Sequence, residues 1–142
     1  MQLFQDRIVC LTSSDNRAVQ GQLSLPNFLA LPHVRPLGTG RPTTARVIDE
    51  AVEKQGHQLE KLFLVQNFLT MPFILAGTDM LATLPRLLAQ TFAEQHGLQM
   101  LEPPLRLARI RYAAYWHERS QKDAGHRWLR TLLQDVARGL RS

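Results

Sequence analysis

Residues 66–85, QNFLTMPFILAGTDMLATLP, restrict the possible folds more than any other part of the chain. The segment is almost entirely apolar, and Gly77 divides it. The order of the residues in this segment predicts a strand end, a short buried helix that begins at Thr70 or Pro72, a glycine turn and a second buried strand at residues 80–84. Buried strands and helices of this kind are typical of a sheet that helices cover on both faces.

The neighbouring segments repeat this alternation. Continuous apolar runs predict further buried strands at residues 8–12, 33–35 and 62–65. Capping residues and helical periodicity predict helices that begin at Ser24, at Thr43 or Thr44, and at Pro85. The alternation of strands and helices predicts an α/β domain with a mainly parallel sheet.

The end of the chain has another pattern. Pro103 and Pro104 predict a crossover, residues 110–116 alternate as a strand with two unequal faces, and residues 125–140 predict a helix. One broad apolar stripe runs along this helix and consists of Trp128, Leu129, Leu132, Leu133, Val136 and Leu140. Because one strand and one helix cannot make a core, this part needs a further packing surface.

Length and composition exclude several classes of protein. The 142 residues are enough for one domain, and no apolar run approaches the roughly 20 residues that span a bilayer. The N-terminus lacks the basic and apolar regions of a signal peptide, and Cys10 has no second cysteine to pair with. We therefore expect a cytoplasmic protein without a membrane contact.

The basic charge is concentrated at the end of the chain. Residues 105–142 contain nine Lys or Arg and three Asp or Glu, a net charge of +6, whereas residues 1–104 have a net charge of −1. Such a segment can contact nucleic acid or an acidic partner, or it can be the solvated face opposite the apolar stripe. We favour the solvated face, because no zinc finger, helix-turn-helix or RNA-binding motif accompanies these arginines.

Four segments carry a resemblance to a known family: DRIVCLTSSDN, LSLPNFLALPHVR, NFLTMPFILAGTDMLATLPRLLAQTFA and YAAYWHERSQKDAGHRWLRTLL. Their order and spacing resemble the effector-sensing domain of LysR-type transcriptional regulators, and lean toward the branch of nodulation and aromatic-degradation regulators. The resemblance covers essentially the whole chain. It implies a type 2 periplasmic-binding-protein fold, in which two crossover strands join two lobes and a small-molecule effector binds in the cleft between them.

The resemblance also implies a division of the chain. Residues 1–100 would form the second lobe, and residues 101–142 would form the returning strand and C-terminal helix of the first lobe. The rest of the first lobe and the DNA-binding domain would be absent, so DNA would be bound only through that missing domain. Because family members form antiparallel dimers, we expect the C-terminal segment to pack onto another copy, in a homodimer or a higher oligomer.

The first candidate ligand site follows the strand at residues 33–35. Thr39, Gly40 and Arg41 lead there into the helix that begins at Thr43. Glycine allows a close approach of the backbone, a helix N-terminus suits a carboxylate, and Arg41 can add a bidentate contact. The alternative is a surface turn with an ordinary cap, but the family resemblance implies effector contacts in this loop.

Two further residues are weaker candidates. Asn67 follows the strand at residues 62–65 and either contacts a ligand or starts a helical turn, and Thr12, at the end of the first strand, has the same ambiguity. The histidines lack metal-ligand spacing, and no serine or cysteine nucleophile motif and no P-loop or dinucleotide-binding motif is present. We therefore predict no catalytic residue, metal or cofactor, and a protein that is not an enzyme.

The sequence thus predicts the effector-sensing and dimerisation domain of a LysR-type transcriptional regulator. The expected effector is a small aromatic compound or carboxylate. Transcription would be controlled through the attached helix-turn-helix domain that this chain lacks. The alternative is a free-standing solute-binding or protein-interaction module of the same fold.

Overall fold

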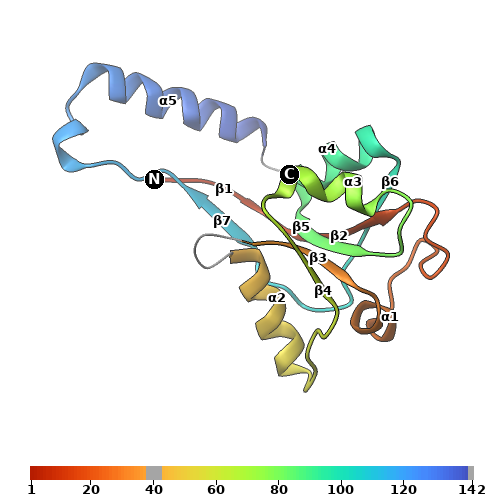
Figure 1. Ribbon diagram of the computed structural model, residues 1–142. Helices are drawn as coiled ribbons and strands as arrows, with labels where there is room; N and C mark the ends of the chain where they lie inside the picture. The colour runs from red at the N-terminus through yellow and green to blue at the C-terminus, as the bar shows by residue number, and fades with distance from the viewer. Residues whose placement is uncertain (38–42, 141–142) are drawn as a thin grey trace. The chain divides into compact units, whose positions relative to one another are not determined.

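The computed structural model describes residues 1–37 and 43–140, with only the backbone of Thr43 (Figure 1). The chain forms two compact units: Arg7–Ala108 is the larger, and Met1–Asp6 with Arg109–Ser142 is the smaller. The division differs from the one expected at residue 100. The first six residues belong to the smaller unit, while Leu105 and Leu107 still pack against the core of the larger unit.

A five-stranded sheet forms the centre of the larger unit, in the order β4-β3-β5-β2-β6. The strands are β2 (Ile8–Ser13), β3 (His33–Pro36), β4 (Leu62–Val65), β5 (Leu81–Pro85) and β6 (Leu98–Leu101). β3 is parallel to β4 and β5, whereas β2 is antiparallel to both β5 and β6. Four strands therefore run in one direction and β2 in the other, which confirms the mainly parallel sheet.

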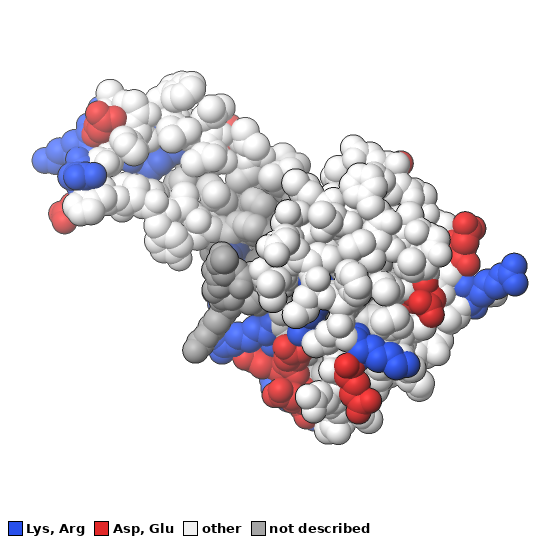
Figure 2. All heavy atoms as spheres, in the orientation of Figure 1, with Lys and Arg blue, Asp and Glu red and all other residues white. Residues whose placement is uncertain are grey.

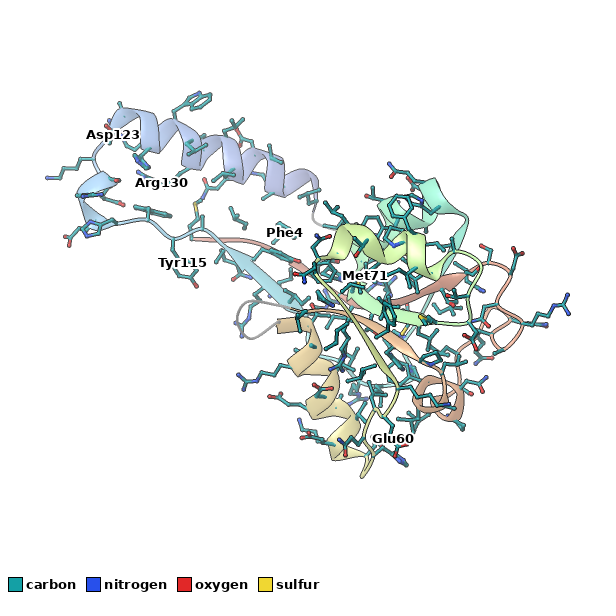
Figure 3. The ribbon with its side chains drawn as sticks, in the orientation of Figure 1. Phe4, Glu60, Met71, Tyr115, Asp123 and Arg130 are labelled. Atoms are coloured by element: carbon teal, nitrogen blue, oxygen red, sulfur yellow. The ribbon has the colours of Figure 1, made fainter. Side chains whose placement is uncertain are left out.

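Helices cover both faces of this sheet (Figure 1). They are α1 (Leu25–Ala30), α2 (Thr43–Lys54), the 3-10 turn η1 (Phe68–Thr70), α3 (Met71–Leu75) and α4 (Arg86–His96). One core joins α3 and α4 to the sheet around the fully buried Met71 (Figure 3), and the other joins α1 and α2 around the fully buried Phe28. β2 contributes to both cores because Val9 and Cys10 point to opposite faces.

Glycines follow the ends of two helices, and the sequence predicts the turn at Gly77. Gly97 ends α4 with φ at 63°, and Gly77 follows α3 with φ at 74°. Both values lie in the left-handed region, where a residue with a Cβ atom is strained. β6 begins directly after Gly97, and this strand was not predicted from the sequence.

In the smaller unit, β1 (Gln2–Asp6) pairs antiparallel with β7 (Ile110–Ala113), and the rings of Phe4 and Tyr112 stack at 4.5 Å. The 3-10 turn η2 (Glu118–Ser120) and the helix α5 (Ala124–Gly139) follow. β7 is shorter than the predicted strand at residues 110–116, and β1 was not predicted.

Arg130 holds the turn before α5 in place (Figure 3). Its guanidinium group lies 4.6 Å from the centre of the Trp116 ring and donates to the carbonyl oxygens of Ser120 and Gln121. The carboxylate of Asp123 accepts a hydrogen bond of 2.8 Å from the backbone N–H of His126 and caps the helix. Trp116 therefore packs against Arg130 instead of extending β7.

The predicted apolar stripe of α5 is exposed in the structure. Trp128 and Val136 are 67% and 58% exposed, and Leu129, Leu132, Leu133 and Leu140 are each at least 36% exposed. Among the described residues, no helix is long and apolar enough to cross a membrane.

Candidate functional site

The carboxyl ends of β3, β4, β5 and β6 lie at one edge of the five-stranded sheet, because these strands are parallel to one another. β2 begins at this edge because it runs the other way. The backbone N–H of Leu37 donates to the carbonyl oxygen of Val65 and holds the ends of β3 and β4 together. Ligands of open α/β sheets bind at this kind of edge, so it is the candidate ligand-binding edge.

An ion pair fastens α2 to the end of β3. Both terminal nitrogens of Arg35 donate to the carboxylate of Asp49, at 3.1 and 2.5 Å, and the Arg35 side chain is only 14% exposed. The sequence analysis missed this pair because the two residues come from different elements. Arg35 ties the middle of α2 to β3, and its charge is already paired.

The loop that the sequence predicts as a ligand site comes directly before α2 in the chain. Thr39, Gly40 and Arg41 lie outside the described residues, and Thr43 is the first residue of α2. The described residues between β3 and the first turn of α2 leave a crevice of only about 10 Å³. A crevice of this volume has room for a single water molecule at most, so these residues alone hold no ligand.

Asn67 lies at the same edge, directly after β4. Its side-chain oxygen accepts a hydrogen bond of 3.0 Å from the backbone N–H of Leu69, and its carbonyl oxygen accepts one from the hydroxyl of Thr70. Asn67 therefore caps the helical turn η1, which is one of the two roles that the sequence allowed for it. Within the described part of the chain, the side-chain NH₂ of Asn67 has no partner, so this exposed residue still offers a donor.

Thr12 lies at the opposite edge of the sheet, opposite Gln99 near the start of β6. The side chain is fully buried, and its hydroxyl donates to the carbonyl of Met80 and accepts from the side-chain nitrogen of Asn16, both at 2.8 Å. The structure thus separates Thr12 from Asn67 and from the start of α2, and its hydroxyl bonds two groups of the fold itself.

A groove in the larger unit lies at the β6 side of the ligand-binding edge. Its volume of about 800 Å³ is within the range of small-molecule sites. Gln22, Met100 and Pro103 line it together with Arg7 and Glu102, which form an ion pair. β6 lies three strand spacings, about 14 Å, from β3. Of the candidate residues that the structure describes, neither Thr12 nor Asn67 lines the groove.

Two buried titratable groups contribute to packing. Burial lowers the pKa of His33, whose Nε2 donates to the carbonyl of Phe28 at 2.6 Å. Burial raises the pKa of the Cys10 thiol to about 12, so the thiol is protonated and unreactive in the folded chain. The described residues contain no group of three or more His, Cys, Asp or Glu that could hold a metal ion.

Comparisons with known proteins agree with the arrangement of strands and helices. The family model of the LysR substrate binding domain matches residues 1–138. Nodulation protein D of Rhizobium leguminosarum bv. trifolii is 30% identical over 135 residues, which are 95% of this chain and 42% of that protein. The transcriptional activator NahR of Pseudomonas putida is 33% identical over 134 residues, 94% of this chain and 44% of that protein.

Solved structures show the same fold. The regulatory domain of MexT, a transcriptional activator in Pseudomonas aeruginosa, matches with a TM-score of 0.82 and 28% identity over 94% of this chain and 65% of that chain. The effector-binding domains of QuiR, in complex with shikimate, and of BenM, with benzoate, match with TM-scores of 0.66 and 0.62 at 10% identity, which shows the fold alone.

The chain therefore has a periplasmic-binding-protein-like fold, and it spans less than half the length of the curated relatives it matches. The family model extends over nearly all of its residues. The chain belongs to the family of LysR substrate-binding domains.

Proposed function

We propose that this chain is the effector-sensing and dimerisation domain of a LysR-type transcriptional regulator. Family membership supports this proposal, because substrate-binding domains of this family occur in transcriptional regulators such as NahR. The chain covers only part of such a protein. Control of transcription therefore needs a DNA-binding segment that lies outside these residues, and effector binding would change how that segment is presented.

The single observation that carries the proposed site is the arrangement at the ligand-binding edge. α2 and Asn67 follow two neighbouring parallel strands, β3 and β4, whose ends the Leu37–Val65 hydrogen bond joins. α2 has 12 residues and no acidic residue in its first turn, so the partial positive charge of its N-terminus is not neutralised locally. Such a helix start favours an anionic ligand.

The proposed effector is a small carboxylate, aromatic or cyclic, and its contacts are Thr39, Gly40, Arg41, Thr43 and Asn67. The ligands of the QuiR and BenM domains, shikimate and benzoate, both carry a ring carboxylate, which supports this class of effector. Thr12 is left out of the proposed site, because its hydroxyl is already bonded at the opposite edge.

Self-association is the second part of the proposal. The exposed stripe contains five large apolar side chains on α5 and Leu140 directly after it, and surfaces of this kind usually contact another protein. The proposed partner is a second copy of the chain, which gives a homodimer or a higher oligomer.

The groove beside β6 supports the alternative of a free-standing solute-binding module. It lies within the larger unit alone and has the volume of a small-molecule site. A ligand that protects this groove, and not the proposed edge, would favour the alternative.

A thermal-shift experiment with benzoate and shikimate tests the proposed site. At a ligand concentration of about 100 Kd, the free energy of unfolding rises by about 2.7 kcal/mol, which raises Tm by several degrees. Arg41→Ala should abolish this rise. Arg46→Ala is the matched control, because Arg46 is exposed on α2 and paired with Glu50. An unchanged shift in the Arg41 variant would contradict the site.

A further inference from the structure

The groove beside β6 combines apolar walls with one pair of opposite charges. Its volume is about 800 Å³, and every residue that lines it belongs to the larger unit. Val9, Leu23 and Leu101 line it as buried side chains, whereas Met100 and the prolines at positions 103–104 reach the surface. Sites for small molecules typically have apolar walls and a few polar groups that fix the orientation of the ligand.

The charged residues that line this groove are Arg7 and Glu102. Nη1 of Arg7 donates to Oε1 of Glu102, and the two side chains remain 50% and 68% exposed. An ion pair with this exposure contributes only about 0–1 kcal/mol to stability. A ligand that rearranges the pair therefore loses little, and it gains a partner of each sign.

β6 also directs backbone groups of Met100 away from the sheet. The carbonyl oxygen of Gly97 accepts a hydrogen bond of 3.2 Å from the backbone N–H of Ser14. Hydrogen-bonded and non-hydrogen-bonded pairs alternate along antiparallel strands, so Met100, which lies opposite Leu11, points its N–H and C=O away from β2. In the described part of the chain, no strand pairs with this outer side of β6.

Two opposite charges in direct contact select a ligand that carries both charges itself. A simple carboxylate is attracted by Arg7 and repelled by Glu102, and a simple amine is attracted by Glu102 and repelled by Arg7. In an α-amino acid, the carboxylate and the ammonium group are attached to one carbon, so both find a partner at the same time. The N–H and C=O of Met100 offer a further donor and acceptor to the same two groups.

We propose that this groove binds an α-amino acid with an apolar side chain, at a site separate from the proposed effector site. The carboxylate of the ligand pairs with Arg7 and its ammonium group pairs with Glu102. The apolar side chain lies against Met100 and the prolines that follow Glu102.

The ion pair between Arg46 and Glu50 shows what the groove adds. Asp, Glu, Lys and Arg gather over α2 in Figure 2, and Arg46 donates there to Glu50 with both side chains at least 50% exposed. An amino acid bound to such a surface pair would keep its apolar side chain in water. The apolar walls beside Arg7 and Glu102 remove that side chain from water, which favours binding.

Isothermal titration calorimetry with a matched series of ligands tests the proposed class. L-leucine is the probe, isocaproate is leucine without the ammonium group, and isoamylamine is leucine without the carboxylate. Each of the two should bind at least about tenfold more weakly than L-leucine, because a hydrogen-bonded charge is lost and an opposing charge is left. Free glycine, which lacks the apolar side chain, should also bind more weakly.

Two variants connect this preference to the groove. Glu102→Gln should weaken L-leucine binding at least about tenfold but bind isocaproate at least as well as the unchanged protein, because the repelling carboxylate is gone. Arg7→Gln should weaken L-leucine binding and bind isoamylamine at least as well. Glu50→Gln is the matched control, because it removes a carboxylate from an exposed ion pair on α2 and should leave L-leucine binding unchanged. Circular dichroism checks that the variants are folded.

The proposal fails if L-leucine does not bind at millimolar concentration, if isocaproate or isoamylamine binds as well as L-leucine, or if the folded Arg7 and Glu102 variants bind L-leucine unchanged. Displacement of L-leucine by saturating benzoate would also overturn it, because the two ligands would then share one site. Arg41→Ala should abolish benzoate binding and leave L-leucine binding intact. Loss of benzoate binding alone would therefore contradict the effector site and not the groove.

Discussion

Replacing Thr12 by valine distinguishes a structural role of this residue from a role in ligand binding. Valine keeps the shape of threonine but removes the hydroxyl that bonds Met80 and Asn16 at 2.8 Å. Leaving a buried carbonyl or amide without its partner costs about 1–3 kcal/mol. The free energy of unfolding should fall by this amount, although the substitution removes no apolar contact.

Cys10 provides a local assay for this loss. The thiol lies two residues from Thr12 on β2, is fully buried, and is the single cysteine of the chain. A thiol reagent reaches it only when the larger unit opens, so its rate of modification reports the population of the open state. A loss of about 1–3 kcal/mol should speed modification by about 5- to 150-fold.

Thr12→Ser is the matched control, because serine retains both hydrogen bonds and loses only a methyl group. Its modification rate should lie nearer to that of the unchanged protein. A Thr12→Val protein with an unchanged rate would refute the structural role. If that protein also lost its thermal shift with benzoate, Thr12 would return to the effector site.

Two further predictions concern stability alone. Burial lowers the pKa of His33 in the folded chain, so the unfolded chain binds the extra proton first as pH falls, and stability should decline below about pH 6.5. His33→Gln should flatten the dependence of urea stability on pH between about 5 and 6.5, and His57→Gln, at an exposed histidine, should leave it unchanged. Asp123→Ala removes the cap of α5 and should cost about 1 kcal/mol, whereas Asp123→Asn retains a capping oxygen. Equal unfolding curves for the two Asp123 variants would argue against the cap.

Local signals in the sequence were sufficient to predict most strands and helices of the larger unit. The apolar run of β4, the short helix α3 and the glycine stops at Gly77 and Gly97 are all visible within a few residues. β1 and β6 were missed because their strand state depends on distant partners. β1 pairs with β7 near the other end of the chain, and β6 pairs with β2.

The placement of Thr12 shows how strand direction limits inference about a site. The rule that ligands bind at the carboxyl ends of strands assumes that the strands are parallel. β2 runs against its neighbours, so its carboxyl end lies at the opposite edge from Asn67. No local feature of residues 8–13 encodes this direction, because it follows from pairing with β5 and β6.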